Sequence, residues 1–140
     1  EKGFRTALQQ AKVRFDEKLL YQGDYTCESG VAVVQAIMQL KDRPTAFFCF
    51  GDQVAIGALH ALRELGYRVP EDISVIGVDG IALSQYSAPP LTTVAQPLTL
   101  IGEHCATLLI DLIEGKQPEK LVHILPHQLL IRASTGPAPK

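Results

Sequence analysis

Blocks of strand-like and helix-like spacing alternate along the chain. The stretches 45–50 (TAFFCF) and 73–78 (ISVIGV) are apolar at nearly every position and have the length of one strand. Apolar residues recur three and four positions apart in 27–40, 52–65 and 98–114, which predicts helices. Because the two strands lack an alternation of apolar and polar residues, we expect them to be buried on both faces. That pattern is typical of a parallel sheet in an α/β fold.

The two ends of the chain are less regular. Helical spacing begins within 1–11 with no capping residue before it, so we expect a fragment that starts inside a helix. The stretch 18–25 (KLLYQGDY) predicts a short strand that runs into a loop, and 120–134 predicts one or two strands. The last stretch, 135–140, contains nothing to bury and is expected to be disordered.

Composition narrows the class of protein. The chain has 140 residues, 46% of them hydrophobic and 20% charged, and a formal net charge of −2, which fits one globular domain. Its sequence has no basic stripe for nucleic acid, no Lys/Arg cluster for anionic lipid and no apolar run that could span a bilayer. The three cysteines are widely spaced, which favours reduced thiols and a cytoplasmic protein.

The position of one carboxylate suggests a binding role. Asp79 directly follows the apolar run 73–78, and Gly77 and Gly80 leave room for a ligand to approach the backbone. In open α/β sheets, ligands bind at the carboxyl ends of the parallel strands. Asp79 could accept hydrogen bonds from the hydroxyls of a polyol or from a ring N–H, or it could simply begin a turn. The pattern alone favours neither interpretation.

Gly51 and Asp52 follow the other apolar run in the same way. Asp52 precedes a helical pattern, so we interpret it first as the N-cap of that helix and only second as a ligand contact. Gly66 is expected to end the same helix, since glycine readily adopts the left-handed conformation found there.

The sequence contains no motif of the common catalysts or cofactor sites. Its glycine-rich stretches match neither GxGxxG nor GxxxxGK[ST], and there is no GxSxG elbow. Metal-ligand spacing is missing from all four histidines, which are His60, His104, His123 and His127. We therefore predict no catalytic residue, no metal site and no cofactor, and we do not expect an enzyme.

Two blocks at a fixed spacing carry a family resemblance. The block 43–80 (RPTAFFCFGDQVAIGALHALRELGYRVPEDISVIGVDG), followed by 89–97 (PPLTTVAQP), resembles the C-terminal half of the lactose/galactose-repressor (LacI/GalR) family of bacterial transcription regulators. The stretches KGFRTAL and QGDYTCESG match earlier segments of that family. The resemblance therefore covers nearly the whole chain except the tail.

The resemblance implies a periplasmic-binding-protein-like (type I) fold, in which two α/β lobes are hinged by crossovers and hold a small effector between them. On this comparison 1–134 is the C-terminal lobe, and about 94–122 crosses to an N-terminal lobe that is mostly absent from this chain. The DNA-binding headpiece, a helix-turn-helix, is absent as well. The helix 98–114 is then expected to pack on the absent lobe, and its apolar stripe to drive association where that lobe is missing.

By the same resemblance, the effector would be contacted by Asp79, Tyr25, Gln96 and Gly51. In the family pattern Asp79 bonds a hydroxyl or a ring, Tyr25 stacks on a sugar or base, and Gln96 lies at the crossover. Gly51 stands where many sugar-binding members carry an asparagine, and it supplies only backbone.

The implied function is that of the effector-sensing and dimerisation domain of a bacterial DNA-binding transcriptional repressor. The effector would be a sugar, a sugar phosphate, a nucleoside or a purine, and operator DNA would be bound through the headpiece. The protein would be a cytoplasmic homodimer with no membrane partner. Its dimer contact would include Ile56, Ile81, Tyr86 and Ser87. A periplasmic sugar-binding protein of a transport system shares this fold and is the alternative.

Overall fold

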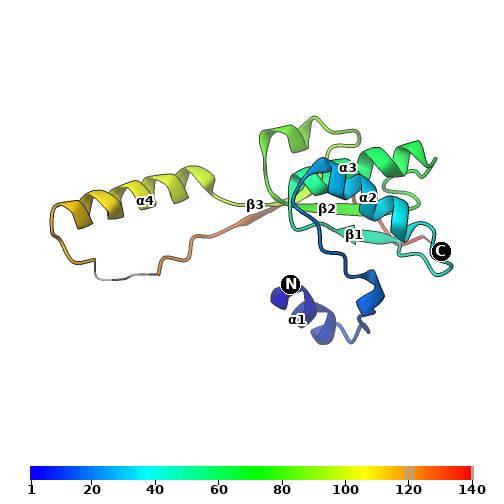
Figure 1. The fold of residues 1–140 in the computed structure, drawn as a ribbon, viewed down its shortest axis with the longest axis horizontal. Coiled ribbons are helices and arrows are strands. Elements are labelled where there is room, and N and C mark those ends of the chain that lie inside the picture. Colours follow the sequence, from blue (N-terminus) through cyan, green and yellow to red (C-terminus); the bar gives the residue numbers. More distant parts are fainter. Residues whose placement is uncertain (119, 121, 140) are drawn as a thin grey trace.

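The computed structural model describes residues 1–118, 120 and 122–139 and divides into a body and an arm (Figure 1). At the centre of the body is a four-stranded sheet in the order β1-β2-β3-β4. The strands are β1 (Ala46–Phe48), β2 (Ser74–Asp79), β3 (Thr92–Ala95) and β4 (Gln128–Leu130). The first three run parallel, and β4 runs antiparallel to β3. The prediction of an α/β fold with a mainly parallel sheet is confirmed.

Two helices, α2 (Cys27–Ile37) and α3 (Asp52–Glu64), pack against one face of the sheet and against each other. Their backbones approach very closely at two glycines. A Cβ on Gly30 would lie 2.1 Å from the carbonyl oxygen of Val54, and one on Gly57 would lie 2.0 Å from that of Cys27. Only glycine fits at either position, so the two helices form one tightly packed unit.

The hydrophobic core lies between these helices and the sheet. Its buried members are Val34, Ile37, Met38, Phe47, Cys49, Ala55, Ala58, Leu59, Ala61, Leu62, Ile73, Val75 and Leu91. Along β2, Val75 and Gly77 are buried, whereas Ile76 and Val78 on the opposite face are only half-buried. The expectation of strands buried on both faces is therefore wrong for β2, because helices α2 and α3 cover only one face.

The first helix, α1 (Lys2–Gln10), confirms the helical pattern at the start of the chain, and none of its residues is buried. It contacts the edge strand β1 through Phe4, whose ring stacks on that of Phe48 at 5.2 Å between centroids. Phe15 packs edge-on against Phe4 at 5.9 Å. Stacking of aromatic side chains thus contributes to the attachment of α1 to the body.

The strand expected at 18–25 does not form. A short 3₁₀ helix, η1 (Glu17–Leu19), lies there instead, and the side chain of Asp16 caps it by accepting a hydrogen bond from the Lys18 amide at 3.0 Å. No strand pairs with the chain that follows among the described residues. An extended stretch becomes a strand only when a neighbour receives its backbone hydrogen bonds, and that neighbour cannot be read from local pattern.

The end of the chain is more ordered than its composition suggests. The Ser134 side chain is fully buried, accepts a hydrogen bond from the Thr92 amide at 2.8 Å and donates one to the Val75 carbonyl at 2.6 Å. Gly136 exchanges hydrogen bonds with the Ser74 hydroxyl at 3.1 and 3.3 Å. The expected disorder of 135–140 is therefore wrong for its first two residues, since Thr135 also bonds the Thr92 hydroxyl at 3.0 Å.

The arm consists of α4 (Leu98–Ile113) and the described residues of the following segment, 114–118, 120 and 122–127, and it projects away from the body (Figure 1). No residue of α4 is buried, and its large apolar side chains, such as Ile113 at 77% exposure, face solvent. Gly115 follows the helix with φ +76°, as expected for the residue after a helix C-terminus. Within the described residues, no helix has the length and hydropathy needed to cross a membrane.

Candidate ligand-binding site

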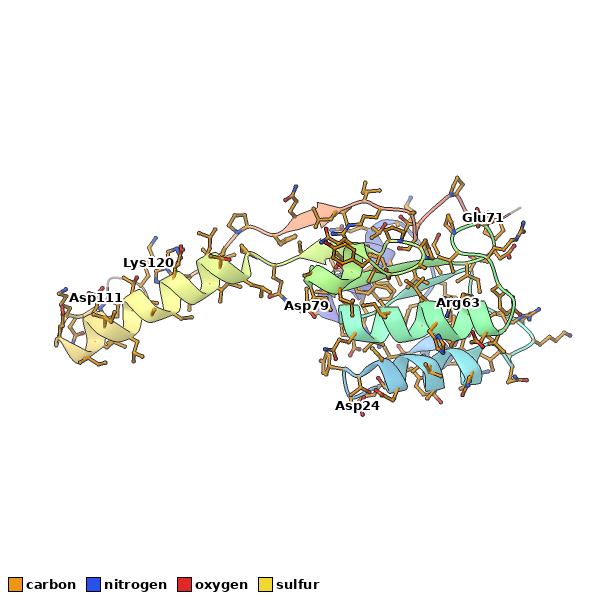
Figure 2. All side chains as sticks on the ribbon, turned by 90° about the horizontal axis from the view of Figure 1, so that it is seen from above. Asp24, Arg63, Glu71, Asp79, Asp111 and Lys120 are labelled. Atoms are coloured by element: carbon orange, nitrogen blue, oxygen red, sulfur yellow. The ribbon has the colours of Figure 1, made fainter. Side chains whose placement is uncertain are left out.

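Asp79 is the last residue of β2 and lies at the end of the body that faces the arm, opposite Arg63 and Glu71 (Figure 2). Its φ of +117° and that of Gly80, +75°, place two successive residues in the left-handed region. A Cβ on Gly80 would lie 2.5 Å from that of Ala95, so only glycine allows this close approach of the turn to β3. The backbone of Asp79 is thus held in an unusual conformation.

Gln96 binds Asp79 through both its backbone and its side chain. The Gln96 amide donates to the Asp79 carbonyl at 3.1 Å, and its side-chain Nε2 donates to Asp79 Oδ1 at 2.7 Å. The pairing follows from the register, because β2 and β3 place Asp79 opposite Ala95. Asp79 Oδ2 accepts no hydrogen bond within the described part of the chain. One carboxylate oxygen is therefore oriented by the protein while the other is available.

Gly51 and Tyr25 lie next to that available oxygen. An ideal Cβ on Gly51 would be 3.7 Å from Asp79 Oδ2 and 3.5 Å from Tyr25 Cδ1. Gly51 is the N-cap of α3 and has an extended backbone. Its missing side chain leaves a gap between the carboxylate and the aromatic ring. The structure thus brings Asp79, Gln96, Gly51 and Tyr25 together from four separate segments.

Tyr25 is fixed by the turn that precedes α2. Asp24 Oδ1 accepts hydrogen bonds from the Thr26 hydroxyl at 2.6 Å and the Thr26 amide at 3.1 Å. These bonds, that of the side chain first, lower the pKa of the Asp24 carboxyl from its usual value. Thr26 in turn caps α2 by accepting from the Ser29 amide at 3.1 Å. Between these contacts Tyr25 adopts φ +64° and leaves its side chain 67% exposed, available for stacking.

Asp52 does not cap α3, and the sequence prediction that it does is wrong. The N-cap is Gly51, and Asp52 is the first residue of the helix and completely buried. Its Oδ2 accepts a hydrogen bond from the Ile81 amide at 2.8 Å, and its Oδ1 accepts one from the Thr93 hydroxyl at 2.6 Å. Side-chain capping requires an acceptor that turns back to its own helix, whereas this carboxylate points into the sheet. Thr93 was not singled out from the sequence.

The four residues expected at a dimer contact lie in two places. Ile56 is on α3, half-buried against the core. Ile81 precedes the 3₁₀ helix η2 (Ala82–Gln85), and Tyr86, 76% exposed, ends it. The Ser87 hydroxyl donates to the carbonyl oxygens of Ser84 and Pro89 and stabilises the loop. No partner chain is present to test the dimer contact, which stays a prediction.

The candidate site is an open face of the body. A cavity of about 830 Å³ lies between α1, α2 and β1 and reaches the site only at Tyr25. Asp79, Gly51 and Gln96 line neither this cavity nor the smaller one of about 300 Å³ near the C-terminal tail. The residues Asp79, Gln96, Gly51 and Tyr25 therefore form a single wall of a binding site. A ligand bound to this wall alone would remain half in solvent.

The chemistry of this wall is that of binding through hydrogen bonds and stacking. It provides an oriented carboxylate acceptor, a side-chain amide and an aromatic face. Within the described residues, no three His, Cys, Asp or Glu side chains are grouped so that they could hold a metal ion. His104 and His123 approach each other on the arm at 5.7 Å between ring centroids, far from the wall.

Comparison with known proteins identifies the family to which the chain belongs. Residues 1–135 match the family described as periplasmic binding protein-like domain. The HTH-type transcriptional repressor PurR of Vibrio atlanticus (strain LGP32) is 41% identical over 133 residues, which cover 95% of this chain and 40% of that protein. The chain therefore spans about two-fifths of the length of this relative.

Solved structures give the same result. The transcription regulator CcpA of Lactococcus lactis superposes with a TM-score of 0.90 at 34% identity and covers 96% of this chain and 49% of its own. A complex of the transcriptional regulator CelR with cellobiose superposes with a TM-score of 0.87 at 38% identity, covering 94% and 40%. The chain belongs to the periplasmic binding protein-like domain family, and within it to the effector-binding domains of the LacI/GalR type.

Proposed function

We propose that this chain is the effector-sensing and dimerising part of a DNA-binding transcriptional repressor. The observation that carries the proposal is the convergence of Asp79, Gln96, Tyr25 and Gly51 at the carboxyl end of the parallel sheet. The similarity to the HTH-type repressor PurR and to two transcription regulators supports it. In the full protein, operator DNA is bound by a helix-turn-helix headpiece outside this chain.

The composition of the wall favours a polar ring as the effector. Asp79 Oδ2 accepts a hydrogen bond from a hydroxyl or a ring N–H, and Tyr25 stacks on the ring. Glycine at position 51 keeps side-chain atoms out of the space between Asp79 Oδ2 and Tyr25. Sugars, sugar phosphates, nucleosides and purines meet these requirements. One relative's structure is a complex with cellobiose, which is consistent with a carbohydrate.

The open face implies a second wall that completes the cleft. A helix such as α4, apolar and without a buried residue, requires a covering surface, and a second lobe reached by about 94–122 provides it. Effector that binds both walls favours the closed arrangement of the lobes over the open one. This difference in affinity increases the population of the closed arrangement. The change at the hinge then alters the geometry of the headpieces on DNA.

The remaining expectations follow from this role. The repressor is a cytoplasmic homodimer whose contact includes Ile56, Ile81, Tyr86 and Ser87, of which Tyr86 is a large side chain exposed after β2. It binds its effector without catalysing a reaction on it, because the wall contains a hydrogen-bond acceptor and an aromatic ring but no nucleophile paired with a base.

Isothermal titration of the intact protein against pentoses, hexoses, their phosphates, nucleosides and purines tests the proposal. We expect one class to bind, and Asp79→Asn to weaken that binding by about 1.5–3 kcal/mol, because a charged acceptor is lost. Asparagine also tolerates the positive φ of this position.

Asp72→Asn is the matched control, since Asp72 precedes the opposite end of β2 and bonds Arg68. Its affinity for the effector should equal that of the wild type. Binding that survives Asp79→Asn unchanged, or no binding by any compound of these classes, would contradict the proposed site.

A further inference from the structure

The buried side chain of Asp52 contacts segments on either side of Asp79. Asp52 begins α3 directly after Gly51, accepts the hydrogen bond of Ile81 after β2, and accepts that of Thr93 within β3. Three of the four residues of the candidate site follow or precede these contacts by one to three positions. Gly51 is one residue before Asp52, Asp79 is two before Ile81, and Gln96 is three after Thr93.

We infer that Asp52 is a positioning residue for the ligand-binding wall. The inference rests on the proposed role of Asp79 and Gln96 in ligand binding, and it assigns to Asp52 the task of holding that pair in place. Asp52 does not itself reach the wall, because its side chain is completely buried.

The strained turn after β2 explains why such a residue is needed. Asp79 at φ +117° adopts a conformation that is uncommon for a residue with a Cβ and that persists only when the surroundings impose it. Gln96 holds the turn on the Asp79 side through its amide and side chain. The bond from the Ile81 amide to Asp52 Oδ2, at 2.8 Å, holds the other side.

A carboxylate is well suited to this place. Both partners of Asp52 are donors, an N–H and an O–H, and a carboxylate accepts on both oxygens. Its negative charge lies in the first turn of α3, where the helix dipole stabilises it. The space is also closed from the sheet side, since a Cβ on Gly77 would lie 2.3 Å from Asp52 Oδ1. The side chain is therefore fixed from three directions.

Nuclear magnetic resonance of the ¹⁵N-labelled protein tests the inference without any effector. In the wild type we expect the Ile81 amide proton and one Gln96 Nε2 proton to resonate downfield as hydrogen-bonded donors. Asp52→Ser is too short to reach either partner, so the Ile81 signal should lose its downfield shift. The two Gln96 protons should then collapse toward the shifts of a free glutamine side chain, because Asp79 has moved.

Asp52→Asn is the conservative variant, and Ser134→Ala is the matched control. The asparagine can accept from Ile81 and donate to the Thr93 hydroxyl, so it should restore most of both signals. Ser134 is equally buried and makes two hydrogen bonds at the opposite end of the same strands. Ser134→Ala should lower stability while leaving the Gln96 signals in place.

The Gln96 signals show whether Asp52 positions Asp79 and Gln96 or only stabilises the fold. A folded Asp52→Ser protein with unchanged Gln96 protons would overturn the inference. If Asp52→Ser does not fold, Thr93→Val, which removes one donor and keeps the volume, takes its place and should shift the same protons. Because these measurements use no ligand, the outcome of the effector screen does not affect them.

Discussion

Helices α3 and α4 are both apolar on one side, yet they have opposite surroundings. Seven of the 13 residues of α3 are buried, while none of the 16 residues of α4 is. The spacing of apolar residues predicts both helices with nearly correct ends. The difference shows that such a pattern specifies a helix and a face to be covered, but not the surface that covers it.

The glycines within the two helices repeat the contrast. Gly57 in α3 touches the backbone of α2, whereas a Cβ on Gly102 in α4 would meet no atom within 4 Å. Glycine in a helix costs stability relative to alanine unless close packing requires it. The close packing of α2 on α3 explains Gly57, whereas no contact among the described residues explains Gly102.

The largest expected difference between the body and the arm is in the reactivity of their cysteine thiols. Burial first, and the charge of Asp52 second, raise the pKa of the Cys49 thiol from 9.0 to about 12. Three pKa units correspond to about a thousandfold less thiolate at a given pH, and the thiolate is the nucleophile. Cys105 on α4 is exposed. Mass spectrometry after brief iodoacetamide treatment at pH 8 should find Cys105 labelled and Cys49 unlabelled.

Labelling in guanidinium chloride, where both thiols react, controls for their intrinsic chemistry. A Cys105 as strongly protected as Cys49 in native buffer would show that the arm is covered in solution. That result would contradict the expectation that α4 is exposed while α3 is buried.

Truncation of a leucine should have the next largest effect. Leu62→Ala in α3 removes a fully buried side chain and should lower the free energy of unfolding by about 2–5 kcal/mol. Leu109→Ala in α4 removes one that is 59% exposed and should change that free energy by no more than about 0.5 kcal/mol. Urea denaturation followed by circular dichroism measures both. Equal losses would mean that α4 is packed as tightly as α3.

Alanine in place of glycine should give a smaller effect with opposite signs in the two helices. Gly57→Ala forces α2 and α3 apart and should destabilise by about 1–3 kcal/mol. Gly102→Ala adds helix propensity in open space and should stabilise by about 0.5–1 kcal/mol. Differential scanning calorimetry should show melting temperatures that move in opposite directions. A loss of stability in both variants would place a neighbour against Gly102.

Local pattern predicted those parts of the fold that depend on local interactions. The helices, strands β1 and β2 and the stop at Gly66, which has φ +82°, follow from spacing and turn chemistry. The role of Asp52 could not be predicted in this way. Its partners Ile81 and Thr93 are 29 and 41 residues away, and only the finished sheet brings them to it.

Only part of the candidate site could be predicted from the local sequence pattern. Position after a strand pointed to Asp79, but its bond to Gln96, 17 residues later, depends on the register of β2 and β3. Tyr25 and Gln96 came only from the family resemblance, since nothing in their immediate sequence marks them. Ser134 lies at the end of the stretch 120–134 that was predicted as strand, but its burial was not predicted, because a buried hydroxyl has the same local sequence as an exposed one.

The arm joins the body through two passages of chain, and Gln96 lies on one of them, one residue after β3 ends and two before α4 begins. Its side chain is tied to the carboxylate that a ligand would use. A molecule that binds the free Oδ2 would therefore contact the same carboxylate whose Oδ1 holds the start of the arm. Ligand binding and the attachment of the arm would then depend on a single side chain.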